Sequence, residues 1–153
     1  MTATSSGSSS SAPSPRRSAR PRVLLDANAL FLPFRVGFPL LAEVERLVPG
    51  AVVSVPSSVR GEVARLAHRG VAEAAAALSF AGRFPTIQVR ARGDAAILRA
   101  ARRHSAIVVT ADRALTARLR AGGLAVLVPR DRHRLELRPA VRRGDRPVSR
   151  GNG

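Results

Sequence analysis

The 153-residue sequence contains no cysteine, lysine, tryptophan or tyrosine, and each absence excludes a class of chemistry. Without cysteine there is no disulfide scaffold, no thiolate nucleophile and no cysteine-ligated zinc or iron–sulfur site. Without lysine there is no P-loop lysine and no Schiff base. Aromatic residues make up only 3% of the chain, which argues against a base-stacking platform. No apolar run approaches the ~20 residues that span a membrane, so we expect no membrane partner.

Positive charge is abundant: 26 basic residues face 10 acidic ones, and the formal net charge is +16. A genome rich in arginine codons explains arginine in place of lysine, but it does not explain the excess of bases over acids. Arginine-rich surfaces gain affinity for polyanions because binding releases phosphate counterions. The composition therefore favours a nucleic-acid partner, and RNA is the one we expect.

The chain is long enough for one domain with one core. Residues 1–20 are rich in Ser, Pro and Arg and carry no acid, which predicts a disordered tail, with a targeting segment as the alternative. They contain no apolar segment of the secretory type, and we expect a cytoplasmic protein. Residues 21–139 form the predicted domain, and residues 140–153 a second, basic, disordered tail.

Apolar runs of strand type alternate with helical patterns along the domain. This alternation predicts an α/β fold with a mostly parallel sheet of about five strands, covered by helices on both faces. Between residues 29 and 38 the prolines predict only a short helical turn and a bend, and Ser57 and Ser58 are expected to cap the next helix. The predicted strands are 23–25, 51–55, 86–89, 105–110, 124–128 and the edge strand 135–137; the predicted helices are 40–48, 59–68, 71–81, 95–104 and 113–120.

Four of the ten acids fall at matching places in this pattern. Asp26 and Asp112 follow buried strands, while Glu62 and Asp94 lie near the beginnings of helices. In a parallel sheet all four positions belong to the carboxyl edge, where ligands bind. A carboxylate cluster in a basic protein is costly unless a cation neutralises it, and oxygen ligands favour Mg²⁺ or Mn²⁺. The pattern fits metal-assisted hydrolysis of a phosphodiester.

Each acid also has an ordinary structural explanation. Asp26, Asp94 and Asp112 are placed where a side chain caps a helix. Glu62 could pair on the helix surface with Arg65 or Arg69. The joint placement of all four acids at one edge favours a site over four independent coincidences.

Four segments resemble the PIN-domain ribonucleases: residues 24–28 (Leu-Leu-Asp-Ala-Asn), 53–62 (Val-Ser-Val-Pro-Ser-Ser-Val-Arg-Gly-Glu), 93–97 (Gly-Asp-Ala-Ala-Ile) and 107–115 (Ile-Val-Val-Thr-Ala-Asp-Arg-Ala-Leu). The chain looks most like archaeal PIN proteins related to the nuclease of the eukaryotic small-subunit processome, with VapC-type toxins as more distant relatives. The resemblance implies a three-layer α/β/α fold and Mg²⁺- or Mn²⁺-dependent endonucleolytic cleavage of RNA. Two positions depart from the family pattern, Ala111 in place of the frequent Asn and Gly93 in place of a further acid.

The same resemblance assigns roles to individual residues. Asp26, Glu62, Asp94 and Asp112 match the family's catalytic, metal-binding acids, and Asn28 and Thr110 match its supporting polar residues. It leaves three functions open: ribosomal RNA processing, a toxin ribonuclease with an antitoxin partner, and an RNA-binding scaffold that does not cleave. A homodimer and a ribosome-assembly partner are further expectations. Basic residues expected to contact RNA are Arg113, Arg130, Arg132 and Arg134, with a solvated basic loop as the alternative for the last three.

Overall fold

The computed structural model describes residues 20–142, so the two predicted tails lie almost entirely outside the described residues. One six-stranded sheet runs through the domain in the order β3-β2-β1-β4-β5-β6. The strands are β1 (Arg22–Leu25), β2 (Val52–Pro56), β3 (Thr86–Ile87), β4 (Ile107–Val109), β5 (Val126–Pro129) and β6 (Leu135–Arg138). All neighbours pair in parallel except β5 and β6, which are antiparallel. The predicted mostly parallel sheet is confirmed; each of the six predicted strand segments overlaps one of its strands, so the sheet has one strand more than the overall expectation of about five.

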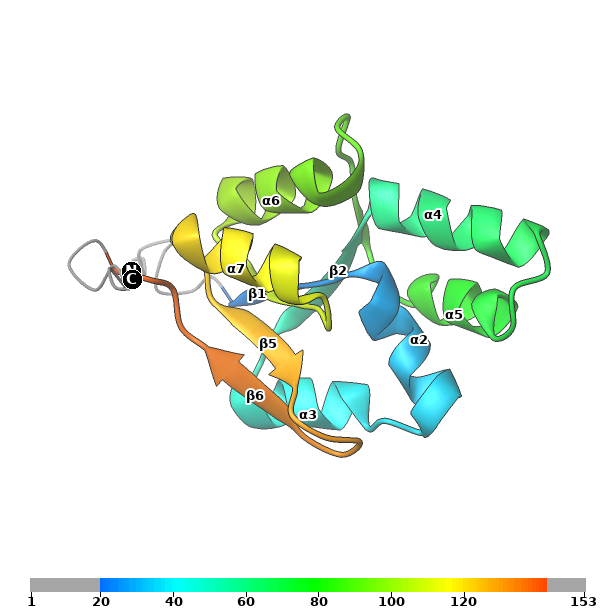
Figure 1. Cartoon of the computed structure of the whole chain (residues 1–153), viewed down its shortest axis with the longest axis horizontal. Coiled ribbons are helices and arrows are strands. Elements are labelled where there is room, and N and C mark those ends of the chain that lie inside the picture. Colours follow the sequence, from blue (N-terminus) through cyan, green and yellow to red (C-terminus); the bar gives the residue numbers. More distant parts are fainter. Residues whose placement is uncertain (1–19, 143–153) are drawn as a thin grey trace, which may run out of the picture.

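Five segments of chain lead from strand to strand, and four of them contain one or two helices. The helices are α2 (Ala27–Val36), α3 (Leu40–Leu47), α4 (Ser57–His68), α5 (Ala74–Ala81), α6 (Gly93–His104) and α7 (Arg113–Ala121). Figure 1 shows α6 and α7 together on one side of the sheet, α3 on the opposite side, and α2, α4 and α5 grouped next to one another. None of the helices within residues 20–142 has the length and apolar character needed to cross a bilayer.

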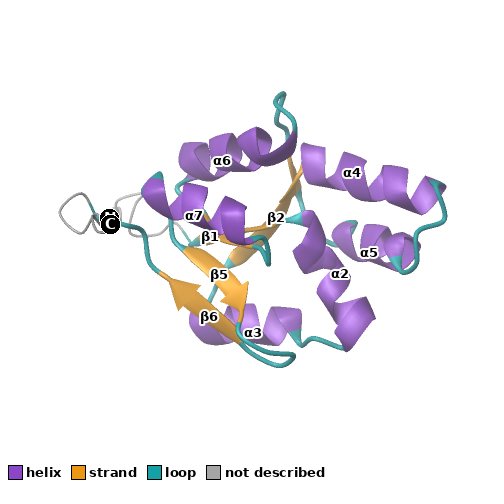
Figure 2. Ribbon diagram, in the orientation of Figure 1, coloured by secondary structure: helices purple, strands orange, loops and turns teal. Residues whose placement is uncertain are grey.

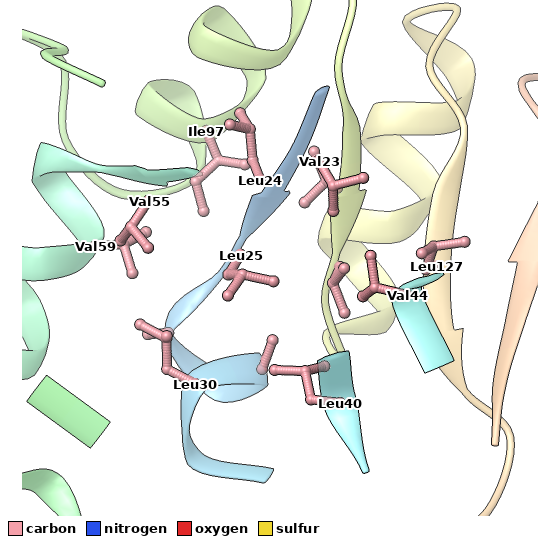
Figure 3. Packing of buried hydrophobic residues seen from close by; sticks show 14 of the residues in the cluster. Val23, Leu24, Leu25, Leu30, Leu40, Val44, Val55, Val59, Ile97 and Leu127 are labelled. Atoms are coloured by element: carbon pink, nitrogen blue, oxygen red, sulfur yellow. The ribbon is translucent and has the colours of Figure 1, made fainter. Parts of the chain in front are cut away.

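Strand β1 lies at the centre of the hydrophobic core. Val23, Leu24 and Leu25 are completely buried, as expected for a strand covered on both faces. Successive side chains point to opposite faces. Figure 3 shows Leu24 beside Ile97 of α6, whereas Leu25 lies on the side of Leu30 and Leu40. Burial on both faces fixes the register of β1, and with it the position of the residue that follows the strand.

Helix α2 is longer than the sequence predicts. The expected short turn and bend are wrong: ten residues are helical, with Pro33 inside the helix. Proline removes one helical hydrogen bond and disfavours the preceding turn. Burial of Ala29, Leu30 and Phe31 against the core offsets this local cost. The helix ends at Gly37, whose φ of 65° lies in the left-handed region that favours glycine.

The outer edge of the sheet is anchored by an ion pair between the buried Glu43 and the exposed Arg46. Glu43 of α3 is bonded to Arg46 through two hydrogen bonds of 2.7 and 3.0 Å. Glu43 Oε1 also accepts a hydrogen bond from the backbone N–H of Leu135 at 2.9 Å, and Arg46 donates to the carbonyl of the same residue at 3.0 Å. Both backbone groups of Leu135 are therefore satisfied by α3. The pair therefore occupies the beginning of the outer edge of β6, where another strand could otherwise pair.

Candidate active site

Asp26 stands directly after β1, at the carboxyl edge of the sheet. Asp26 is only 8% exposed. Its backbone N–H continues the sheet by donating to Val109 at 3.1 Å, and its Oδ1 accepts from the backbone N–H of Ala27 at 2.8 Å. Asp26 thus caps α2, as its ordinary explanation requires. The cap uses only Oδ1, which leaves Oδ2 turned toward the next strand.

Thr110 and Asn28 hold the second oxygen of Asp26. The fully buried hydroxyl of Thr110, at the end of β4, donates to Asp26 Oδ2 at 2.7 Å. Asn28 Nδ2 donates to the same oxygen at 3.2 Å. Asn28 Oδ1 accepts the backbone N–H of Ala111 at 2.8 Å, so its amide orientation is set by two partners. The two residues predicted as supporting ones therefore lie in direct contact with Asp26.

Asp112 belongs to the same network through the backbone. Its N–H donates to the hydroxyl of Thr110 at 3.1 Å, and its Oδ1 accepts from the N–H of Leu115 at 3.0 Å. Asp112 is therefore the cap of α7, and its other carboxylate oxygen has no hydrogen-bond partner within residues 20–142. The side chain is exposed at the mouth of the site. Such a carboxylate oxygen remains free to bind a ligand.

Asp94 and Glu62 complete the set of acids from two other helices. Asp94 lies in the first turn of α6 without capping it, and its Oδ2 is 3.5 Å from Nη1 of Arg118 on α7. Glu62 is exposed in the middle of α4 and, as far as the structure describes the chain, forms no ion pair with Arg65 or Arg69. Glu62 is thus a solvent-exposed helix acid, as its ordinary explanation expects, but the expected pairing with Arg65 or Arg69 is wrong for the described residues. Gly93 has a φ of 61°, which favours glycine and explains why no further acid stands before Asp94.

The surroundings of Asp26 disfavour the negative charge of its carboxylate. Burial is the largest cause and raises the pKa of the Asp26 carboxyl above its usual value; the negative charges of Glu62 and Asp94 raise it further. The hydrogen bonds from Thr110 and Ala27 lower this pKa and oppose the effect of burial. The structure thus brings Asp26, Glu62 and Asp94 within reach of one another's charge. A cation near Asp26 would relieve both the burial and the repulsion.

The carboxylates are near enough for the charges of Glu62 and Asp94 to act on Asp26, but they do not form one compact cluster. No three Asp, Glu or His side chains between residues 20 and 142 are grouped tightly enough to enclose a metal ion by themselves. Mg²⁺ dehydrates reluctantly and is commonly held by one or two carboxylates together with several waters. The hard oxygen donors, the raised pKa of Asp26 and the free oxygen of Asp112 fit an ion bound in that way.

The predicted RNA-binding arginines separate into two groups. Arg113 and Arg130 line a groove of about 540 Å³ between α7 and the β5–β6 hairpin. Arg132 and Arg134 do not line it; they lie in the turn that Figure 2 shows beside α3, and Arg134 is near enough to Glu43 to lower the pKa of that carboxyl. Arg120 and Arg138, which the sequence reasoning missed, line the groove instead. The spacing of Arg113, Thr116, Ala117 and Arg120 is that of one helix face and could have indicated part of this surface.

Residues 23–132 match the family described as "PIN like domain". This stretch makes up most of the chain and contains all four acids, and the chain belongs to this family. The resemblance drawn from the sequence is thereby confirmed.

Two solved structures show the same fold. One is described as the structure of the PIN domain endonuclease Utp24; it superposes with a TM-score of 0.65 at 20% identity, over 79% of this chain and 95% of that one. The other is a domain of a functionally unknown protein from Methanocaldococcus jannaschii, with a TM-score of 0.52 at 17% identity, over 72% of this chain and 92% of that one. No curated protein matches the sequence. At these identities the two structures establish the three-layer architecture and leave the activity to be argued from the residues.

Proposed function

We propose that the protein is a divalent-metal-dependent endoribonuclease whose active site is formed by Asp26, Glu62, Asp94 and Asp112. The proposal is carried by one observation, the way in which the Asp26 carboxylate is buried and hydrogen-bonded. Three hydrogen bonds hold this carboxylate in place at the carboxyl edge of the sheet, although burial and two neighbouring acids disfavour its charge. The cap of α2 uses only Oδ1 of Asp26, so the second oxygen, held by Thr110 and Asn28, is available to a cation that would offset the cost of the buried charge.

Mg²⁺ or Mn²⁺ is the cofactor that these donors fit. Asp26, Asp94 and Asp112 would hold the ion, and Glu62 would hold a second ion or orient the attacking water. When bound, such an ion lowers the pKa of a water and stabilises negative charge on the attacked phosphate. Metal binding has a readout that does not depend on turnover: Mn²⁺ should raise the melting temperature of the parent, because it binds the folded state. The gain should be smaller for Asp26→Asn.

The chain's own residues position the acid that does this work. Thr110 and Asn28 orient Asp26 Oδ2, and Thr110 receives the N–H of Asp112, so that the two acids share one support. Arg118 Nη1 lies 3.5 Å from Asp94 Oδ2, so α7 places a positive charge beside this acid. Such preorganisation of charged groups is a large part of how metal-dependent active sites work.

RNA is the proposed substrate for two reasons. The net charge of +16 favours a polyanionic partner, and PIN domains are commonly nucleases. The resemblance of the sequence to archaeal relatives of the small-subunit processome nuclease favours a role in ribosomal RNA processing, whereas a toxin role would require an antitoxin encoded beside this gene. An RNA-binding scaffold without turnover is the proposal from another class, and the hydrogen-bonded acid set weighs against it.

The test is an incubation of the full chain with a mixture of precursor ribosomal RNA and transfer RNA, with Mn²⁺ in one arm and EDTA in the other. Cleavage only with Mn²⁺ would support the proposal, and the RNA that disappears would separate processing from toxin activity. Tight RNA binding without any cleavage would replace the nuclease with the scaffold.

A further inference from the structure

We infer that the groove between α7 and the β5–β6 hairpin is a binding track for the sugar–phosphate backbone of the RNA strand that enters or leaves the active site. The inference rests on the proposed function, because it names how the substrate of that site is held. Four arginines line the groove, Arg113 and Arg120 from α7, Arg130 after β5, and Arg138 at the end of β6, and no acidic residue does.

The groove begins where the candidate active site ends. Ala111 lines it and at the same time donates its N–H to Asn28, which holds Asp26. Asp112, the next residue, caps α7. From this point the groove follows α7 across the sheet, since its lining residues on that helix are Arg113, Thr116, Ala117 and Arg120. In Figure 1 the same helix lies beside β5, and β6 follows on the far side of β5. A strand in the groove would therefore end beside Asp112 and the residues that hold Asp26.

Helix α7 separates two kinds of arginine. Arg118 faces the acids and contacts Asp94 at 3.5 Å. Arg113 and Arg130 face the groove and form no ion pair within residues 20–142. Arg138 is bonded through Nε to Glu136, and Arg120 through Nε to the carbonyl of Pro139, which holds both side chains over the groove and leaves their terminal nitrogens for a ligand. Fixed guanidinium groups bind phosphate better than mobile ones, because less side-chain freedom is lost.

The lining chemistry selects a backbone rather than bases. The groove contains no aromatic side chain on which a base could stack. The arginine sites match phosphate oxygens, and contacts of that kind fix position without reading sequence. The protein's own C-terminal segment is an unsuitable occupant, since residues 142–153 contain four arginines and a single aspartate. We therefore expect affinity from this groove to be independent of sequence and strongly dependent on salt.

The experiment measures binding of the full chain to a fluorescent single-stranded oligouridylate in EDTA, at several salt concentrations. Each phosphate contact contributes about 0.7 to the slope of log K against log salt on a single strand. Arg113→Gln with Arg130→Gln should lower the slope by roughly 1.4 and weaken binding roughly 20-fold at ~0.1 M salt. The matched control is Arg65→Gln, on α4, with Arg69→Gln, at the C-terminal cap of that helix. It removes the same charge from exposed residues that do not line the groove, and it should change the slope much less.

Two further arms separate charge from folding and this inference from the proposed function. Arg113→Lys with Arg130→Lys keeps the charge and should keep most of the slope; an equal loss in that variant would overturn the inference. Equal effects of the groove and control variants, or no effect of either, would also overturn it. If the parent cleaves RNA with Mn²⁺ while the Arg113→Gln, Arg130→Gln variant binds RNA like the parent, the inference about the groove is wrong and the proposed nuclease function still stands. If the parent binds polyglutamate but not RNA, the groove is a site for an acidic protein and the inference is wrong.

Discussion

Thr110 donates a 2.7 Å hydrogen bond to Oδ2 of Asp26 across 84 residues of sequence. This bond joins the ends of β1 and β4, neighbouring strands of the sheet. The same hydroxyl accepts the N–H of Asp112, so both of its hydrogen-bonding roles are used inside the candidate site. Thr110 therefore couples the two strand-end acids, and its hydroxyl lowers the pKa that burial raises on Asp26.

Replacing Thr110 by Val should destabilise the protein and raise the pKa of Asp26 further. The side chain keeps its shape but leaves a buried carboxylate oxygen with one partner fewer, a change that costs about 1–3 kcal/mol. Urea denaturation at neutral pH measures the loss. Thr110→Ser, which keeps the hydroxyl, should recover most of the stability; if Ser and Val are equally destabilised, the hydrogen bond is not the cause.

The stability of the parent relative to Asp26→Asn should fall as pH rises. Because burial raises the folded-state pKa above the usual 3.8, the folded protein keeps a proton on Asp26 at pH values where the unfolded chain has lost it. Between those two pKa values the free energy of unfolding decreases with pH, and above both the difference becomes constant. Asparagine does not titrate. Urea denaturation of both proteins without metal, from about pH 4 to pH 7, measures the difference; an increase with pH would show that the Asp26 pKa is lowered instead.

Asp112 should have separable roles in stability and in cleavage. Asp112→Ala removes the cap of α7 and should cost about 1 kcal/mol of folding free energy as well as activity. Asp112→Asn keeps an oxygen for the N–H of Leu115 and should fold like the parent, yet it should lose most metal-dependent cleavage. Denaturation and RNA cleavage measured on both variants test this; an Asn variant that cleaves at the parental rate would remove Asp112 from the metal site.

Glu43 should make the protein sensitive to acid. Its hydrogen bonds with Arg46 are the main reason that the pKa of this carboxyl is lowered from 4.5 to about 2. A lowered folded-state pKa contributes stability that is complete above 4.5 and is lost as pH falls toward 2. Glu43→Gln should be less stable at neutral pH and should lose less on acidification. Glu45→Gln, on the same helix, is the control, and a parental acid response in Glu43→Gln would disprove the role of the pair.

Much of the site follows from the sequence because parallel strands and their helices impose it. Asp26 was expected at the carboxyl edge because it follows a fully apolar strand, and the structure places it there. Asn28 and Thr110 were expected as supporting residues, and both bond Asp26. These positions depend on local pattern and on sheet topology, which a single sequence expresses clearly.

Features that depend on tertiary contacts were not predictable in the same way. Ser57 was expected to cap α4, but its hydroxyl instead accepts the N–H of Val89 at 2.9 Å and leaves Pro56 at the cap position. The groove needs the antiparallel pairing of β6 with β5, which brings Arg138 to the same surface as Arg130. Nothing in the local sequence of either arginine indicates that they meet.

The most direct test of the central claim is Mn²⁺-dependent cleavage of RNA by the parent, by Asp26→Asn and by Asp131→Asn. The last variant makes the same chemical change in an exposed turn, where Asp131 Oδ1 accepts two backbone N–H groups that an amide oxygen can also accept. The account predicts cleavage by the parent and by Asp131→Asn, and loss of cleavage in a folded Asp26→Asn protein. Cleavage by Asp26→Asn at the parental rate would show that the reaction does not take place at this carboxylate.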